Sequence, residues 1–357
     1  MTRCGSPPRR APARFSPMVV RRCCACSLAL LLLARALPAH SQVVFDGSLG
    51  GPAGPAQTQG TDYRIPVSAG RVPGGGASVF HSFSAFGIET GHSATFFNDT
   101  PQAISRVISR VTGGSPSEIY GTLRSTIGGA DLWLLNPAGV VFGPGARLDL
   151  PAGLHVSTAE SVRLADGTSF AATPQAGESL SAAAPVAFGF LGPAAGNIVV
   201  LPNAGAAASG GAPSVSLPYG TLELGGADVD VAGSVASANG SLVVSARGGI
   251  DVHDGGSLSA NGTVSAGPSG IVYEQASLSL TGERVSVVGP ARAEGATPMV
   301  SLRVFRPDGG SRLEIRAGDV VVTTSAAIET AAVSQTTAPQ TAASHRPTAA
   351  TKSMIAK

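Results

Sequence analysis

The sequence predicts an all-β protein built as a parallel β-helix, a solenoid in which each turn stacks short strands on the turn before. Two observations carry this prediction: the composition, and a repeat of about twenty residues in the second half of the chain. Among 357 residues, 47 are Gly, 13% are charged and 5% are aromatic. Such a composition is typical of many short strands joined by tight turns rather than of a helical enzyme.

The repeat begins with Val229-Asp230-Val231 and continues through Gly233-Ser234-Val235 to the sequence Ser-Ala-Asn-Gly at 237–240. A second copy occupies residues 250–262, at offsets of 21 and 22 residues, and a looser third copy starts at Val320 and leads to Ile328. Alternation within each copy points the aliphatic side chains inward and the aspartates outward. A β-sandwich also has short alternating strands, but it would not repeat its corners at a fixed offset.

The Asn-Gly pairs at 239–240 and 261–262 stand at corresponding places in the two copies. Asn and Gly tolerate the positive φ that tight corners require. We therefore expect both pairs to be corners of the solenoid.

Residues 1–41 predict a secretory signal peptide, cleaved after Ser41. The segment combines six arginines before residue 23, an apolar run from Cys23 to Leu33 and a small-x-small site at Ala39. The run is short for a bilayer-spanning helix, although an uncleaved anchor is the alternative. Met18 alone could start a compact signal, so it is open whether residues 1–17 are translated.

Removing this segment changes the charge and the cysteine content. Seven of the 24 basic residues and none of the 22 acidic ones precede residue 42, so the mature net charge is near −5. A mildly acidic surface argues against nucleic acid as a partner. All four cysteines also lie before the cleavage site. The mature chain therefore has no disulfides, which suits passage through a second membrane but equally suits a large core that needs none.

Three regions follow the signal peptide. Residues 42–194 hold most of the aromatic residues and form one expected domain, and residues 195–330 carry the repeats and form an expected shaft. Residues 331–357 are rich in Ala, Thr, Ser, Pro and Gln without periodicity, which predicts a disordered tail.

The most distinctive segment, Leu132 to Leu150, predicts three strands separated by two turns. The first turn is Asn136-Pro137-Ala138-Gly139 and the second is at 143–145. Proline presets φ at the second turn position, glycine tolerates a conformation that other residues resist, and Asn136 can hydrogen-bond to the local backbone.

This segment resembles the haemagglutination-activity domain of filamentous-haemagglutinin-type two-partner-secretion exoproteins (TpsA-like). The family's turn reads Asn-Pro-Asn-Gly, whereas Ala138 stands at the third position here. Further matching pieces follow in family order, at 80–83 with Phe86, 93–98, 109–114, 121–124 and 156–159. The resemblance implies a right-handed, pectin-lyase-like β-helix whose N-terminal secretion (TPS) domain caps the solenoid.

One segment gives conflicting signals. Ile104, Val107, Ile108 and Val111 follow the i, i+3, i+4, i+7 spacing of a helix, with Thr100 as a possible cap. The family resemblance implies a strand instead, and we adopt the strand.

The resemblance also implies a function. The chain would be a secreted exoprotein or adhesin of a Gram-negative bacterium, exported across the outer membrane by a partner transporter (TpsB-like, with POTRA domains). Asn136, Pro137 and Gly139 are then the candidate secretion-motif residues, with Asn98 as a secondary position. Their alternative role is only to make turns. A host or cell-surface glycan is a possible further partner, and the chain is expected to act as a monomer.

No motif for catalysis, a cofactor or a metal is found. The only lysines, Lys352 and Lys357, lie in the tail, so no phosphate-binding P-loop exists. The sequence has no Gly-x-Ser-x-Gly elbow, and its histidines lack metal-ligand spacing. Asp228, Asp230, Asp251 and Asp254 could form a calcium ladder, although outward solvated side chains explain them better. We therefore expect no enzyme activity and no cofactor.

Two alternatives to the adhesin remain open. The chain could be a β-helical protein that binds or cleaves polysaccharide. It could also be a truncated exoprotein that lacks its adhesive region.

Overall fold

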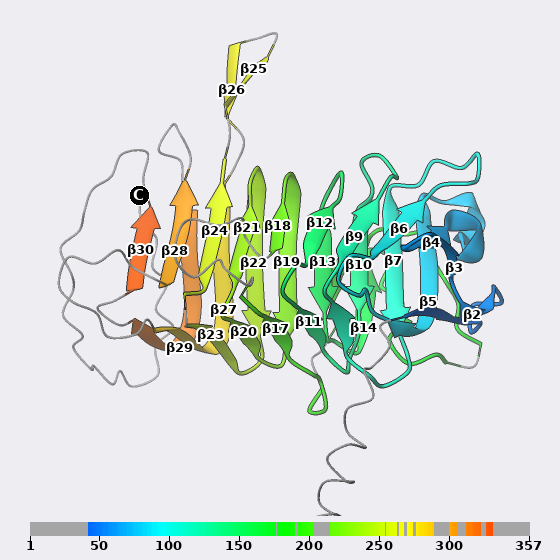
Figure 1. The fold of residues 1–357 in the computed structure, drawn as a ribbon, viewed down its shortest axis with the longest axis horizontal. Helices are drawn as coiled ribbons and strands as arrows, with labels where there is room; N and C mark the ends of the chain where they lie inside the picture. Colours follow the sequence, from blue (N-terminus) through cyan, green and yellow to red (C-terminus); the bar gives the residue numbers. More distant parts are fainter. Residues whose placement is uncertain are drawn as a thin grey trace, which may run out of the picture. The chain divides into compact units, whose positions relative to one another are not determined.

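The computed structural model describes residues 42–175, 177–189, 192–202, 215–253, 255–262, 264–267, 270–273, 276–288, 300–305, 312–322 and 326–330. The expected signal peptide and disordered tail lie outside these residues. Within the compact unit that begins at Ser41, the strands stack as successive rungs along one axis (Figure 1). The predicted parallel β-helix is confirmed.

Three faces make up each rung. Face 1 is formed by β1 (Val43–Asp46), β5 (Ser78–Phe86), β7 (Arg106–Val111), β10 (Asp131–Leu135), β13 (Leu154–Ser157), β19 (Gly220–Gly226), β22 (Gly240–Ala246) and the first parts of β27 (Ser277–Val288) and β29 (Arg312–Val322). Face 2 is formed by β8 (Ser117–Ile119), β11 (Val140–Phe142), β17 (Ile198–Val200), β20 (Val229–Val231), β23 (Gly249–His253) and the second parts of β27 and β29.

Face 3 consists of two five-stranded sheets. The first contains β3 (Gln57–Gln59), β4 (Asp62–Pro66), β6 (Ser93–Phe97), β9 (Thr122–Ser125) and β12 (Arg147–Asp149). The second contains β18 (Val215–Leu217), β21 (Ser234–Ser237), β24 (Ser257–Asn261), β28 (Val300–Phe305) and β30 (Ala326–Thr330). Because β12 and β18 are not hydrogen-bonded to each other, face 3 is interrupted while faces 1 and 2 continue past the same level.

Additional elements lie outside this stack. β2 (Ala53–Pro55) pairs antiparallel with β1; within face 3, β3 pairs antiparallel with β4, unlike the parallel pairs of the other strands of that face. Two short 3-10 helices, Val67–Ala69 and Pro73–Gly75, follow β4, and β25 (Val264–Gly267) and β26 (Gly270–Tyr273) form a hairpin. β14 (Ser161–Leu164), β15 (Ser169–Ala171) and β16 (Pro185–Phe188) form a small antiparallel sheet. Residues 161–188, which contain this small sheet, are called the strap below.

The core is a set of aliphatic ladders inside the helix. On face 1 one ladder joins residues of eight successive strands in parallel register, all of them buried: Val79, Val107, Leu132, Leu154, Leu222, Leu242, Leu278 and Leu313. Parallel register keeps like side chains stacked, so each rung buries its apolar face only against its neighbours. The fold therefore depends on alternation being kept from rung to rung.

The repeat found in the sequence is two neighbouring rungs. Val229 pairs in register with Ile250, and Asp230 pairs with Asp251, as the 21-residue offset predicts. The third copy is also correct, because Val320 continues the same ladder. Between them lies a copy that the sequence reading did not recognise, in which Val285 follows Ile250 after 35 residues.

The prediction for the Asn-Gly corners is correct for the place of Asn239, which lies in the turn before β22, but wrong for the conformation of the glycines. Gly240 is the first residue of β22, and neither Gly240 nor Gly262 has a positive φ. Gly220, which begins β19 and pairs in register with Gly240, does have a positive φ of +90°. A Cβ on residue 240 would lie 1.9 Å from the Gly220 carbonyl oxygen, so only glycine fits at this position. Asn261 pairs with Phe305 as part of a strand.

Residues 106–111 form strand β7, as expected from the family rather than from the helical spacing. The misleading spacing has a physical cause, because β7 is buried on both sides. Val107 and Val111 point into the helix core, whereas Ile108 belongs to a second apolar cluster on the outside. A strand buried on both faces loses the simple alternation that would identify it.

The apolar cluster on the outside of face 1 accounts for the position of the strap. Phe80, Ile108, Trp133 and Leu135 lie on the outer side of face 1 and are called the outer apolar stripe. The strap covers this stripe with four buried side chains, Val162, Leu164, Phe170 and Ala172.

Candidate functional site: the corner at Asn136–Gly139

The corner between β10 and β11 is built by the residues predicted to make a turn. β10 ends at Leu135 and β11 begins at Val140, and the Gly139 amide donates to the Asn136 carbonyl at 3.0 Å. Gly139 has φ +119°, a conformation that a side chain would strain. The corner therefore needs glycine at this position.

The Asn136 side chain is completely buried and holds three neighbours. Its Oδ1 accepts from the Ala138 amide at 3.0 Å, which closes an Asx turn. Its Nδ2 donates to the Ser115 carbonyl at 3.0 Å and to Ser117 Oγ at 2.9 Å, both in the preceding rung. The amide thus links two rungs, and no other residue type provides one acceptor and two donors in this shape.

The following rung closes over the same corner. The Gly196 amide donates to the Pro137 carbonyl at 2.7 Å, and the Val140 amide donates to the Asn197 carbonyl at 3.0 Å. Pro137 and Ala138 remain half-buried, whereas Asn136 and Gly139 are inside. In the folded protein, the polar part of the motif is therefore out of reach of a partner.

Asn98 does not belong to this corner. It follows β6 and is exposed, and its Oδ1 accepts from the Thr100 amide at 2.9 Å while its Nδ2 donates to the Gln102 carbonyl at 2.7 Å. Asn98 thus shapes its own local turn, and the structure does not bring the two asparagines into one site.

Sequence reasoning missed Arg110, the largest fully buried side chain of the described residues. Its guanidinium lies between face 1 and the strap, with Nη1 2.8 Å from each oxygen of Glu178. The available signal was weak: β7 has apolar residues on both sides, so an arginine among them is expected to be buried and paired. The partner, 68 residues away, could not be identified from the sequence.

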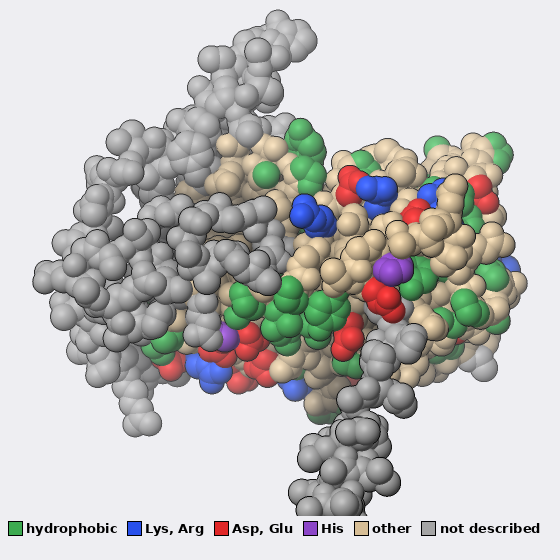
Figure 2. Space-filling model, in the orientation of Figure 1, with side chains coloured by type: hydrophobic (Ala, Val, Ile, Leu, Met, Phe, Trp, Pro, Cys, Tyr) green, Lys and Arg blue, Asp and Glu red, His purple; other side chains and the backbone are tan. Residues whose placement is uncertain are grey.

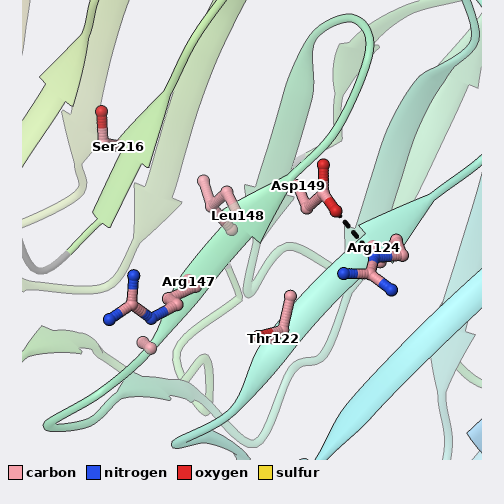
Figure 3. Close-up of a pocket in the computed structure, with 7 residues that line it drawn as sticks. Thr122, Arg124, Arg147, Leu148, Asp149 and Ser216 are labelled. Atoms are coloured by element: carbon pink, nitrogen blue, oxygen red, sulfur yellow. Dashed lines mark hydrogen bonds and ion pairs between the residues drawn. The ribbon is translucent and has the colours of Figure 1, made fainter. Parts of the chain in front are cut away.

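A shallow open cleft lies where face 3 is interrupted (Figure 3). It is lined mainly by β9 and β12, with Ser216 from β18 on the other side. Arg124 Nε donates to Asp149 Oδ2 at 2.7 Å, and both side chains are largely exposed. This ion pair contributes little to stability because it lies in solvent.

The aspartates of the shaft pair with individual neighbours. Asp228 Oδ1 accepts from the Gly249 amide at 2.7 Å, Asp230 lies 3.0 Å from His253, and Asp251 lies 3.0 Å from Arg284. Asp254 is outside the described residues. Within the part of the chain that the structure describes, no group of three or more acidic, histidine or cysteine side chains could hold a metal ion.

The face of the molecule shown in Figure 2 is mostly uncharged. In the view of Figure 2, polar and backbone atoms dominate the described surface and charged side chains occur in small groups. Among the described residues, no helix has the length and hydropathy needed to cross a membrane.

A family model described as the TPS secretion domain matches residues 41–204. The chain carries a TPS secretion domain. The resemblance to TpsA-like exoproteins that the Asn136–Gly139 motif indicated is confirmed. The TPS domain implies an exoprotein that is exported by two-partner secretion with the help of a TpsB-type partner.

Among solved structures, the HMW1 secretion domain from Haemophilus influenzae is similar at 14% identity, covering 82% of this chain and 97% of that chain. Its TM-score is 0.36. No curated protein matches this chain.

Proposed function

We propose that this exoprotein is a non-enzymatic adhesin of a Gram-negative bacterium, exported through the outer membrane from the periplasm. The POTRA domains of a TpsB-type transporter would receive the TPS domain, and the β-helix would fold rung by rung at the cell surface. The match of the TPS domain over residues 41–204 carries this proposal. Stacked rungs that contact only their neighbours suit such stepwise folding. No cysteine follows residue 26, so no disulfide would hinder the passage of the chain.

The secretion motif is proposed to act before the corner closes. Asn136 and Gly139 are buried once the rungs on both sides have stacked, so a transporter would meet these side chains only in an extended chain. Pro137 limits the conformations of that extended segment. Asn98 stays exposed and would be available in either state.

Secretion with and without a co-expressed candidate transporter tests the export. The chain is expected in the medium only when the transporter is present, and it should otherwise remain in the periplasm. Transporter-independent release, or a folded and protease-resistant periplasmic protein despite the transporter, would contradict the proposal.

Two substitutions separate a recognised side chain from a purely structural corner. Asn136→Ala removes the amide, whereas Gly139→Ala strains the same corner and keeps the amide. If Asn136 is recognised, only Asn136→Ala should stop transporter-dependent export. Equal loss of export in both variants would assign the motif to folding alone. Asn239→Ala is a matched control, because Asn239 lies at a corner of the shaft and donates to the Pro218 carbonyl at 2.9 Å.

The adhesive role is tested with the secreted chain itself. Binding to host cells that saturates, and that a defined glycan inhibits, is expected for a monomeric adhesin with a glycan ligand. Absence of binding to cells and glycans, although export is intact, would favour an exoprotein without an adhesive region.

A further inference from the structure

Besides its apolar contacts, the strap is joined to the β-helix by one buried arginine. Arg110 lies on the outer side of β7 and is completely buried. Its Nη1 donates to both oxygens of Glu178, each at 2.8 Å, and to the Ala171 carbonyl at 2.8 Å. Its guanidinium also lies 4.5 Å from the ring centroid of Phe170. All of these partners belong to the strap.

The same guanidinium is anchored on the helix side. Its Nε donates to Ser82 Oγ at 2.8 Å and its Nη2 donates to Ser48 Oγ at 3.0 Å. Ser82 in turn donates to Asp46 at 2.6 Å. The network therefore runs from the first strand of the domain, through β5 and β7, to the strap.

The strands of the β-helix can pair without the strap, whereas Arg110 depends on the strap for its ion-pair partner. The strands β5 and β7 pair with each other without any strap residue. Arg110, however, loses water only when the strap arrives, and a buried arginine is tolerated only when it is paired. Closing the strap and pairing Arg110 with Glu178 must therefore occur together.

The outer apolar stripe shows the same dependence. Outward positions of a parallel β-helix normally face solvent, but Phe80 and Trp133 are buried against Phe170 and Phe188, with ring centroids 4.9 and 5.0 Å apart respectively. An open strap would expose this stripe while the inner ladders stayed packed, because the stripe and the ladders belong to separate clusters.

We propose that residues 161–188 are a separable strap, which closes after the rungs beneath it have stacked and is locked by the Arg110–Glu178 pair. The strap opens as a unit while the β-helix stays folded. In the open state the outer apolar stripe is exposed to solvent, and in the closed state it is buried.

The single tryptophan of the chain makes the strap observable. Trp133 lies in the outer apolar stripe and is 6% exposed, so its quenching by acrylamide measures whether the strap is closed. Hydrogen exchange of the full secreted chain reports the same event residue by residue.

Glu178→Gln tests the lock, with Asp149→Asn as the matched control, because Asp149 also pairs with an arginine but in solvent. Glu178→Gln is expected to raise exchange of strap amides about a hundredfold, since it leaves a buried charge without its partner. Trp133 should become accessible to acrylamide, while amides of β13 and β19 stay protected. Asp149→Asn should change neither quantity.

Three results would overturn the proposal. The first is equal acceleration of exchange in the strap and in β13 and β19, which would make them one cooperative unit. The second is no change in either quantity. The third is measured on the wild type, so it does not depend on a variant that folds. If strap amides exchange no faster than the amides of the rungs in low denaturant, the strap does not open separately. If Glu178→Gln does not fold, this wild-type measurement decides.

Discussion

His81 should make the stability of the domain depend on pH in a defined window. The ring points into the β-helix from β5, is completely buried, and stacks on Phe83 with ring centroids 6.0 Å apart. Burial lowers the pKa of His81 to about 4, and the Pro66 carbonyl, 3.1 Å from Nε2, opposes this shift without overcoming it. In the unfolded chain the pKa of this histidine returns to 6.5.

Whether stability rises or falls with pH depends on whether the folded or the unfolded chain binds the proton more readily. Above pH 6.5 the imidazole is neutral in both states, and its pKa shift costs nothing. Between pH 6.5 and about 4 the unfolded chain binds a proton that the folded chain does not, so stability falls as the pH falls. A difference of about 2.5 pH units, at 1.36 kcal/mol for each, corresponds to a loss of about 3 kcal/mol by pH 4.

Urea unfolding at pH values from 7.5 to 4 measures this loss. Circular dichroism of the strands is the appropriate signal, because Trp133 stacks on the His155 ring, with ring centroids 4.0 Å apart, and its fluorescence therefore reports on that local contact. His81→Phe should remove most of the dependence between pH 6.5 and 4, since a phenyl ring suits the cage of Phe45, Phe83 and Phe96. An equal slope in the variant and the wild type would refute the reasoning.

Three further predictions concern the corner, the core and the acidic end of the network. Gly139→Ala should destabilise the chain by about 1–3 kcal/mol because φ is +119° there, whereas Gly128→Ala, with ordinary φ and open space, should have little effect in the same unfolding assay. Leu242→Ala should cost about 2–5 kcal/mol by leaving a cavity in the face 1 ladder, and a loss below 1 kcal/mol would show that the rungs collapse to fill it. For Asp46, burial acts to raise the pKa, but hydrogen bonds from Ser82, Ser48 and Thr112 hold it below 3.8. Its contribution to stability is therefore present above pH 3.8 and lost below it, and Asp46→Asn should flatten acid unfolding in that range.

Much of the fold could be predicted because a solenoid repeats local rules. Alternation identified the inward residues, and the 21-residue offset placed Val229 under Ile250. The next rung was missed because 35 residues separate Ile250 from Val285. A search for a fixed period cannot recognise a rung that contains an insertion, although the ladder itself is uninterrupted.

The candidate site was predictable in its turn and not in its surroundings. Asn136, Pro137 and Gly139 have the local properties of a corner, and the structure places them in one. The hydrogen bonds from Asn136 to Ser115 and Ser117 form only because the preceding rung stacks against the corner, and the local sequence does not show this. Arg110 was missed for the same reason, since its partners come from three separate segments, at Ser48, at Ser82 and in the strap.

The uneven spacing of the face 1 ladder has a consequence for how this chain can change in length. Leu222 and Leu242 are 20 residues apart and Leu242 and Leu278 are 36 apart, yet all three stack as neighbours. The β25–β26 hairpin occupies part of the longer interval. Added residues at this corner cost mainly the entropy of closing a longer loop, which grows slowly with length, and they leave the interior unchanged. The corner between β24 and β27 is thus a position where foreign peptides could be displayed on the shaft without repacking its core.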